Sequence, residues 1–448
     1  MATGPGVAMR YWISILLIIV LSGCAARHRG EPSKPSAVNY SLAAPELLRI
    51  GLVQNRMKVV IEVKQDALLL AMNNRSQICT VSGSVELNLT DSGVAWKSGS
   101  DSGFNATGLI IMPLNPVGNL IWDETPYPGE FLIQKRGQGL TLINIVELEQ
   151  YLRGVVPWEI GRPGLIGMAA LEAQSVAART YSIANLKNRE VLGFDMWADV
   201  RDQVYRGHSG LDQLCDKAIS NTAGMILRSG GQIVEAYYCS TCGGKTSNIN
   251  QVWAKESKPY LVSHPDGPAG NYHCSASKYS KWETVFNGGE IDQTLLITLP
   301  EYIEWLEASE LRKKWAGKYF IPASPGSDPM TPGRLKNISI QSRTASGRVA
   351  KLAVVTDAGK YIVCGDRTRW VLAPPSGRFS ILKSAWFDVH LSRDAEGRPD
   401  QVTLKGRGFG HGIGMCQTGA LGMAANGTSY KKILKHYYPG SSIEQAWK

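Results

Sequence analysis

Hydrophobic and polar residues alternate along residues 47–144, and this pattern predicts a run of β-strands. The segments that carry it, rich in β-branched residues and separated by Gly, Asn and Asp, are LLRIGLVQ, MKVVIEV, QICTVSGSVELNL and FLIQKRGQGLTLINIV. A period of two residues turns one face of each strand toward a core and the other toward water. We therefore expect a β-rich N-terminal part over residues 47–150.

The period changes to that of a helix over residues 164–187. Apolar residues recur there at helical spacing, and neither Pro nor Gly interrupts the segment after Gly167. The preceding segment, VELEQYLRGVVPWEIG, predicts a short helix and a turn that carries Glu159. The many alanines of the long helix indicate that it packs closely against a sheet.

Strands resume after this helix, so the pattern predicts an α+β fold with mainly antiparallel sheets and a long helix behind the loop of Glu159. A polar, loop-rich insertion over residues 291–335, with a helix near 301–315, separates a central part, residues 151–290, from a second β-rich part, residues 336–448. The last part holds the glycine-rich segment GRGFGHGIG, residues 406–414, and then two short helices.

The first residues predict export. MRYWISILLIIVLSGC, residues 9–24, has one arginine and then an apolar run that is too short for a permanent membrane helix. We interpret residues 1–24 as a signal peptide, with translation starting at Met1 or at Met9.

The end of this run resembles the lipobox of bacterial lipoproteins. LSGC would make Cys24 the lipidated N-terminus of a membrane-anchored protein in the cell envelope, with residues 25–46 as a polar tether. In a Gram-negative cell, Ala25 favours the outer membrane and a domain that faces the periplasm.

Composition and charge limit the classes of binding partner that we expect. The chain has 448 residues, 44% of them apolar, which is enough for one large core or two domains, and a net charge of +10. No basic run with interleaved aromatic residues is present, so we expect no nucleic-acid binding. For an exported protein, the charge indicates attraction to an anionic wall or membrane surface, or an ordinary solvated surface.

Eight cysteines in an exported chain indicate disulfides first, and seven remain once Cys24 is set aside. The segments YYCSTCGG and YHC also offer a Cys3His zinc set made of Cys239, Cys242, His273 and Cys274. Two of these ligands are neighbours in sequence, which is awkward for joint ligation. We therefore favour a disulfide between Cys242 and Cys274, and no metal or other cofactor.

Several common catalytic and cofactor-binding motifs do not match this sequence. The glycine-rich segment lacks the βαβ unit of a dinucleotide site, and its alternate glycines would instead let the backbone approach a strand or an extended ligand. The motifs GxSxG and HExxH are absent. Cys416 with His411 leaves a Cys-His hydrolase open, although a small buried cysteine is the commoner situation.

Glu159 is a candidate general acid. A carboxylic acid donates a proton near neutral pH only when its pKa is raised, and an apolar wall of Val155, Val156, Trp158 and Ile160 would raise it. The alternative is an ordinary acidic residue near a helix N-terminus. Most glycosidases need a second carboxylate, and spacing does not select among Glu172, Asp199 and Asp202.

Four motifs in order resemble the SpoIID/LytB family of bacterial cell-wall proteins, typified by a sporulation protein. They are LEQYLRGVVPWEI with AALEAQSVAARTYSI, DQVYRG, AYYCSTCGGKTSN, and GFGHGIGMCQTGALGMAANGTSYKKILKHYYPG. The resemblance implies one SpoIID-like domain over residues 47–448, with residues 151–290 as its catalytic core. It also implies a lytic transglycosylase acting on peptidoglycan glycan strands, in the SpoIID branch on strands that an amidase has stripped of peptides.

The resemblance gives Glu159 the catalytic role, because it falls on the glutamate of the family's VVxxE motif. Glu159 would protonate the oxygen that leaves C1 of N-acetylmuramic acid and then take the proton of the C6 hydroxyl, which leaves a 1,6-anhydro end. The LytB side implies instead a glycan-binding enhancer of an N-acetylmuramoyl-L-alanine amidase that cuts nothing. A muramidase that uses water is a third possibility and needs a second carboxylate such as Asp199 or Asp202.

Further family positions map onto a glycan groove, each with an alternative role as a buried hydrogen-bond bridge: Gln174, Arg179, Gln203, Tyr205, Ser240, His411 and Gln417. The sequence departs from the family pattern at three places. No Cys or His precedes QVY, so we expect no zinc of the kind some members bind there. Cys416 stands where relatives commonly have serine. Trp158 is bulkier than usual, and either stacks on a sugar or narrows the groove.

Overall fold

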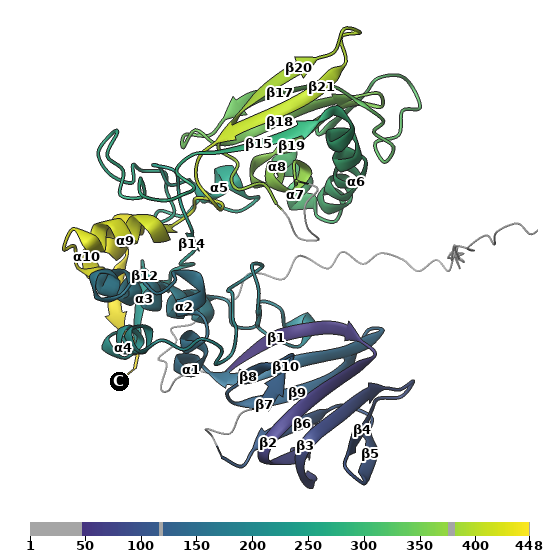
Figure 1. Ribbon diagram of the computed structural model, residues 1–448, viewed down its shortest axis with the longest axis vertical. Coiled ribbons are helices and arrows are strands. Elements are labelled where there is room, and N and C mark those ends of the chain that lie inside the picture. Colours follow the sequence, from purple (N-terminus) through teal and green to yellow (C-terminus); the bar gives the residue numbers. More distant parts are fainter. Residues whose placement is uncertain (1–46, 116–119, 375–380, 448) are drawn as a thin grey trace, which may run out of the picture. The chain divides into compact units, whose positions relative to one another are not determined.

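The computed structural model of the protein describes residues 47–115, 120–374 and 381–447 (Figure 1). The predicted signal peptide, the lipidated Cys24 and the tether of residues 25–46 lie outside the described residues and stay predictions. No helix within the described ranges has the length and apolar character needed to cross a membrane. The fold mixes helices with mainly antiparallel sheets, as the sequence pattern predicts.

The N-terminal part is a sheet of 11 strands in the order β11-β1-β10-β9-β6-β2-β3-β4-β5, with β7 paired to β2 and β8 paired to β7 (Figure 1). Its strands are β1 (Leu47–Arg56), β2 (Lys58–Ala71), β3 (Gln77–Leu89), β4 (Val94–Ser98), β5 (Asp101–Asn105), β6 (Leu109–Pro113), β7 (Leu120–Trp122), β8 (Thr125–Tyr127), β9 (Glu130–Arg136), β10 (Gly139–Glu147) and β11 (Met196–Trp197). In β2, Val59, Ile61 and Val63 are buried between exposed neighbours, so the alternation read from the sequence marks the core face. Among the described strands of this sheet, only β11 pairs in parallel, with β1.

A helical layer follows the sheet in sequence. Its elements are α1 (Leu148–Arg153), α2 (Val156–Glu159), η1 (Leu165–Gly167), α3 (Met168–Ala184), η2 (Glu190–Leu192), α4 (Gln213–Asn221), α5 (Ile249–Val252), α9 (Gln417–Ala425) and α10 (Tyr430–Tyr437). The predicted long helix is confirmed as α3, and every residue from Ala173 to Ile183 is buried. Its alanines allow close approach of α1, α4, α9 and α10 as well as β12, so it packs mainly on helices and not on a sheet alone.

Two small sheets join segments that are far apart in sequence. The first contains β12 (Met225–Ser229), β13 (Gln232–Ile233) and β23 (Ser442–Gln445). The second contains β14 (Tyr238–Cys239) and β22 (Met415–Cys416). The second pair is parallel, with Cys239 opposite Cys416. It brings the glycine-rich segment of residues 406–414 next to the CSTC segment.

Residues 282–406 build a second core (Figure 1). It is formed by β15 (Trp282–Asn287), α6 (Gly288–Glu307), α7 (Glu310–Ala316), β16 (Phe320–Pro322), β17 (Leu335–Arg343), β18 (Val349–Thr356), β19 (Gly359–Cys364), η3 (Gly365–Arg367), α8 (Thr368–Val371), β20 (Phe387–Arg393) and β21 (Pro399–Gly406). Asn287 and Glu290 form a capping box that starts α6. The segment 291–335, expected as a loop-rich insertion, is therefore largely helical and part of this core, because the apolar face of α6 packs on β15, β17 and β21.

This second core yields a stability prediction. Phe286 is fully buried in it, whereas Phe104 on β5 is 50% exposed. We expect Phe286→Ala to lower the free energy of unfolding by about 3 to 5 kcal/mol, since it leaves a cavity, and Phe104→Ala by less than about 0.5 kcal/mol. Urea titration of both variants measures the difference, and equal effects would contradict the second core.

Candidate active site

Glu159 ends α2, a single helical turn held by apolar residues on both sides. Val155 and Val156 are fully buried and Ile160 is nearly so, while Trp158 is 42% exposed. Oε1 of Glu159 accepts a hydrogen bond from the backbone N–H of Val204 at 2.7 Å. Glu159 itself is half-buried, so its carboxyl group lies at the edge of the apolar wall that the sequence predicts.

Burial raises the pKa of Glu159 from its ordinary value of 4.5 to about 7, although the N–H of Val204 and the amide of Gln417 both favour the ionised form. Desolvation dominates because the wall around the carboxyl group offers few polar partners. Burial also raises the pKa of the Tyr238 phenol, and the nearby charge of Glu159 raises it further. At neutral pH, Glu159 therefore exists in both protonation states, as a proton donor and acceptor requires.

Gln417, at the start of α9, connects Glu159 with α3. Its Nε2 lies 3.5 Å from Oε2 of Glu159 and 3.4 Å from Oε1 of Gln174. Gln174 is fully buried, and its own Nε2 has no hydrogen-bond partner in the described part of the chain. One predicted groove residue, Gln417, thus contacts Glu159 directly, and a second, Gln174, is linked to it through Gln417.

Gln203 forms a network of buried hydrogen bonds. It is fully buried, donates to the hydroxyl of Tyr238 at 2.8 Å and accepts from the hydroxyls of Ser182 at 2.9 Å and Tyr151 at 3.3 Å. Its amide group is hydrogen-bonded within the protein, so it orients Tyr238 as a buried bridge would, and contact with a glycan stays a prediction. Tyr238 itself was missed, since one aromatic residue in a motif does not reveal that it stands beside Glu159.

Tyr205 is likewise a core residue. It is 1% exposed, its hydroxyl donates to Oδ1 of Asn144 at 2.8 Å, and its ring packs against those of Tyr127 and Tyr151. This stack joins the loop after β11 to β8 and α1. These contacts fit the alternative role of a buried bridge, and contact with substrate stays a prediction for this residue.

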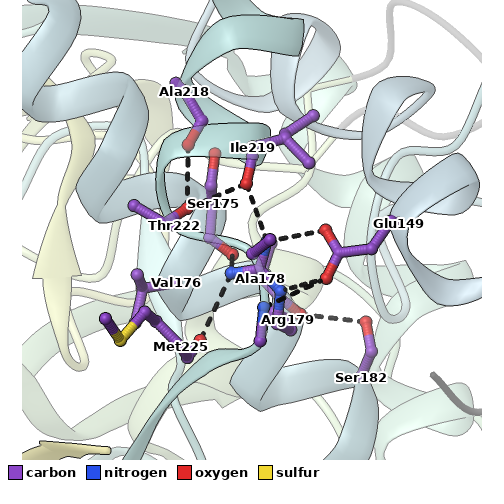
Figure 2. Close-up of polar contacts among 12 residues, drawn as sticks. Glu149, Ser175, Val176, Ala178, Arg179, Ser182, Ala218, Ile219, Thr222 and Met225 are labelled. Atoms are coloured by element: carbon purple, nitrogen blue, oxygen red, sulfur yellow. Dashed lines mark hydrogen bonds and ion pairs between the residues drawn. The ribbon is translucent and has the colours of Figure 1, made fainter. Parts of the chain in front are cut away.

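Arg179 forms a buried ion pair behind the site (Figure 2). Its Nε and a terminal nitrogen bind the two oxygens of Glu149 at 2.8 and 2.7 Å, and it also donates to the carbonyls of Ile219 and Met225. The side chain is fully buried. Arg179 therefore ties α3 to α1, α4 and β12, which fits the alternative role of a buried hydrogen-bond bridge, and sugar binding by this residue stays a prediction.

Ser240 and His411 lie near the start of α9. The carbonyl of Ser240 accepts from the N–H and the hydroxyl of Thr418 at 3.0 and 2.8 Å. Burial lowers the pKa of His411 to about 4, so its ring is neutral at pH 7; it packs 4.8 Å from that of Trp253 and accepts the N–H of Ile413. Their role in substrate binding stays a prediction.

Trp158 has an exposed ring close to Glu159 in sequence. Its Nε1 donates to the carbonyl of Ser209 at 2.8 Å, and the guanidinium of Arg162 lies 5.5 Å from the ring centre. These contacts fix the ring and leave part of it open to solvent, as a stacking platform requires.

The candidate second carboxylates are committed to other contacts. Asp202 binds Arg189 at 2.8 Å and accepts from Tyr181 and the N–H of Trp197, so both of its oxygens are occupied. Asp199 pairs with Arg201 at 2.6 Å on the surface. Glu172 accepts from the amide of Asn221 at 2.8 Å. None of the three has a recorded contact with Glu159 in the part of the chain that the structure describes.

The cysteines form a buried cluster. The Sγ atoms of Cys242 and Cys274 lie 3.8 Å apart, and all seven cysteines in the described ranges are free thiols, so the predicted disulfide is not formed here. Cys416 and Asp266 join this pair, whereas Cys239 and His273 do not. Burial raises the pKa of the Cys416 thiol, which does not suit a nucleophile paired with His411.

The segment that carries Glu159 also matches a known protein family. Residues 136–228, which include Glu159, match the family model described as "Stage II sporulation protein" (SpoIID), and residues 247–414 match "Domain of unknown function (DUF8618)". The chain is similar to the amidase enhancer of Bacillus subtilis (strain 168), with 30% identity over 309 residues that cover 65% of this chain and 40% of that protein. It therefore spans well under half the length of that relative.

Two further relatives are covered more completely. An uncharacterized protein of Brachyspira hyodysenteriae is 25% identical over 422 residues, which cover 90% of this chain and 94% of that protein. The stage II sporulation protein D of Bacillus subtilis (strain 168) is 27% identical over 317 residues, which cover 67% of this chain and 75% of that protein.

The raised pKa of Glu159 predicts a pH-dependent stability. The unfolded carboxyl group loses its proton near 4.5 and the native one near 7, so wild-type stability falls as the pH rises between these values. We expect Glu159→Gln to exceed the wild type in unfolding free energy by about 1 to 3 kcal/mol near pH 8 and to equal it near pH 4. Urea titrations at both pH values test this, with Glu172→Gln as control, and no difference near pH 8 would contradict the desolvation of Glu159.

The Arg179 ion pair makes a separate prediction. Arg179→Met leaves a carboxylate without its partner and should lower the free energy of unfolding by about 3 to 5 kcal/mol. The control Arg201→Met breaks an exposed pair and should cost less than about 1 kcal/mol. Weaker glycan binding by Arg179→Met with unchanged stability would show that Arg179 contacts sugar.

Proposed function

Because this chain belongs to the SpoIID/LytB family of bacterial cell-wall proteins, we propose that it is a lytic transglycosylase that cleaves peptidoglycan glycan strands. One observation carries this proposal: burial brings the pKa of Glu159 to about 7 at a site with no second carboxylate in contact among the described residues. A single group with this pKa can donate a proton in one step and accept one in the next.

In the proposed reaction, Glu159 gives its proton to the glycosidic oxygen between N-acetylmuramic acid and N-acetylglucosamine. The bond from C1 to that oxygen breaks, the C6 hydroxyl oxygen bonds to C1, and its proton passes to the Glu159 carboxylate. The products are a free hydroxyl on one sugar and a 1,6-anhydro ring on the other, and no water is consumed. The N–H of Val204 and the amide of Gln417 stabilise the carboxylate between the two transfers.

The surroundings of Glu159 suit a sugar chain. The exposed ring of Trp158 offers a stacking surface, and Ser240, His411 and Gln417 would contribute polar contacts on the side of α9. We propose strands already stripped of their peptides as the preferred substrate and a cell-wall amidase as the enzyme that supplies them. The lipid anchor at Cys24 would hold the protein at the membrane of the cell envelope.

A second function is favoured by one comparison. The 30% identity to an amidase enhancer supports a protein that binds glycan strands, assists an amidase and cuts nothing. Such a protein would not need a glutamate with a raised pKa, so Glu159 separates the two functions. A water-using muramidase is less well supported, since Asp199 and Asp202 are both held in ion pairs.

The test is mass spectrometry of the products from amidase-stripped glycan strands incubated with the purified full-length chain. We expect anhydromuramic ends from the wild type and at least about a thousandfold fewer from Glu159→Gln, because the amide cannot donate the proton. The control Glu172→Gln, an equal change on α3, should retain activity.

The other outcomes are equally informative. Reducing ends in place of anhydro ends would show a hydrolase and contradict the transglycosylase. Strand binding by wild type and Glu159→Gln alike, without cleavage, would support the amidase enhancer.

A further inference from the structure

Three thiols and a carboxylate form a buried cluster that does not include Glu159. Cys242, Asp266, Cys274 and Cys416 are each no more than 2% exposed. Their ligand atoms, one from each residue, all lie within 4.8 Å of one another. Cys242 follows β14, Asp266 and Cys274 belong to the long segment between α5 and β15, and Cys416 ends β22, so the cluster joins three distant parts of the chain.

We propose that these four residues bind one structural Zn²⁺. The number of ligands is that of a closed structural site, and thiolates with a single oxygen ligand suit zinc. Zinc–sulfur bonds of about 2.3 Å in a tetrahedron place two sulfur atoms about 3.8 Å apart. The Sγ atoms of Cys242 and Cys274 are 3.8 Å apart, whereas a disulfide needs about 2.05 Å.

The groups around the cluster donate toward its ligands. The N–H groups of Cys242 and Gly419 point at Sγ of Cys416 at 3.1 and 3.3 Å. Asp266 accepts the N–H of Cys274 at 2.8 Å and the hydroxyl of Tyr437 at 2.6 Å. Such donors orient metal ligands and stabilise their charged forms. With a metal bound, the two N–H donors at the start of α9 would stabilise the thiolate of Cys416.

A buried cation nearby needs a negative partner. Arg348 is 1% exposed and donates to the carbonyls of Lys245 and Cys242 and the hydroxyl of Ser247, but it forms no ion pair within the described ranges. Its Nε also lacks a hydrogen-bond partner there. A buried charge without compensation is costly. Zinc with three thiolates and a carboxylate has a net negative charge, and it would offset that of the guanidinium.

The zinc would fix one wall of the candidate active site, although the inference does not depend on glycan cleavage. Cys416 is followed by Gln417, whose amide lies against Glu159, and by Thr418, which binds the carbonyl of Ser240. A Cβ on Gly419 would come within 2.4 Å of Asp266, so α9 sits directly on the cluster. Metal binding would therefore position the first turn of α9.

The first measurement is the metal content of the full-length chain, purified under reducing conditions without chelators. Elemental mass spectrometry should find about one zinc per chain. Replacement by Co²⁺ should give thiolate-to-metal charge-transfer absorption and the visible bands of a tetrahedral ion. This measurement requires no variant to fold.

Variants then test the ligand set. Asp266→Asn and Cys416→Ser should weaken zinc binding at least about tenfold, measured by competition with a chromophoric chelator. Cys239→Ser and Cys364→Ser are matched controls, because both remove buried thiols outside the cluster, and they should keep the metal. Metal loss in Cys239→Ser but not in Asp266→Asn would overturn this set in favour of the Cys3His set.

Two results with the wild type would overturn the proposal itself. A metal-free protein with a peptide cross-linked through Cys242 and Cys274 would show that the pair is a disulfide. A metal-free protein in which every cluster thiol reacts after denaturation would show that the cluster is a set of neutral buried thiols.

Discussion

The long helix α3 is buried along most of its length, and several of its polar side chains bond to neighbouring elements in place of water. Arg179 pairs with Glu149 on α1, and the hydroxyl of Thr180 accepts the N–H of Leu227 at 3.0 Å on β12. Gln174 faces Gln417 on α9. Because each contact has one geometry, α1, β12 and α9 are held in place around α3, and the turn that carries Glu159 is held with them.

The raised pKa of Glu159 results from the incomplete solvation of its carboxyl group. Glu159 has one short hydrogen bond and one long one, which is too little to compensate for its burial, and its pKa rises to about 7. Arg179, with its charge fully paired by Glu149, illustrates the opposite situation. The raised pKa of Glu159 costs stability at neutral pH, while the paired charge of Arg179 stabilises the scaffold.

Much of the fold could be predicted because it depends on local pattern. Alternation marked the core face of β2, helical spacing marked α3, and Glu159 could be singled out from its apolar neighbours and the family motif. For Arg179, Gln203 and Tyr205, the sequence could not separate a contact with substrate from a role as a buried hydrogen-bond bridge. A motif shows that a polar residue is needed at a position. A residue that forms a buried hydrogen bond and a residue that binds a ligand can both meet this need, so the motif does not distinguish them.

By itself, the sequence determined the strands, the long helix, the family and the one glutamate with an apolar wall, because these depend on neighbouring residues. Only the tertiary structure decided which side chains meet Glu159, that residues 282–406 form a second core, and that Asp266 and Cys416 join Cys242 and Cys274. These contacts link residues up to 258 positions apart. The spacing of residues along the chain does not predict such contacts, because they depend on how the buried surfaces pack together.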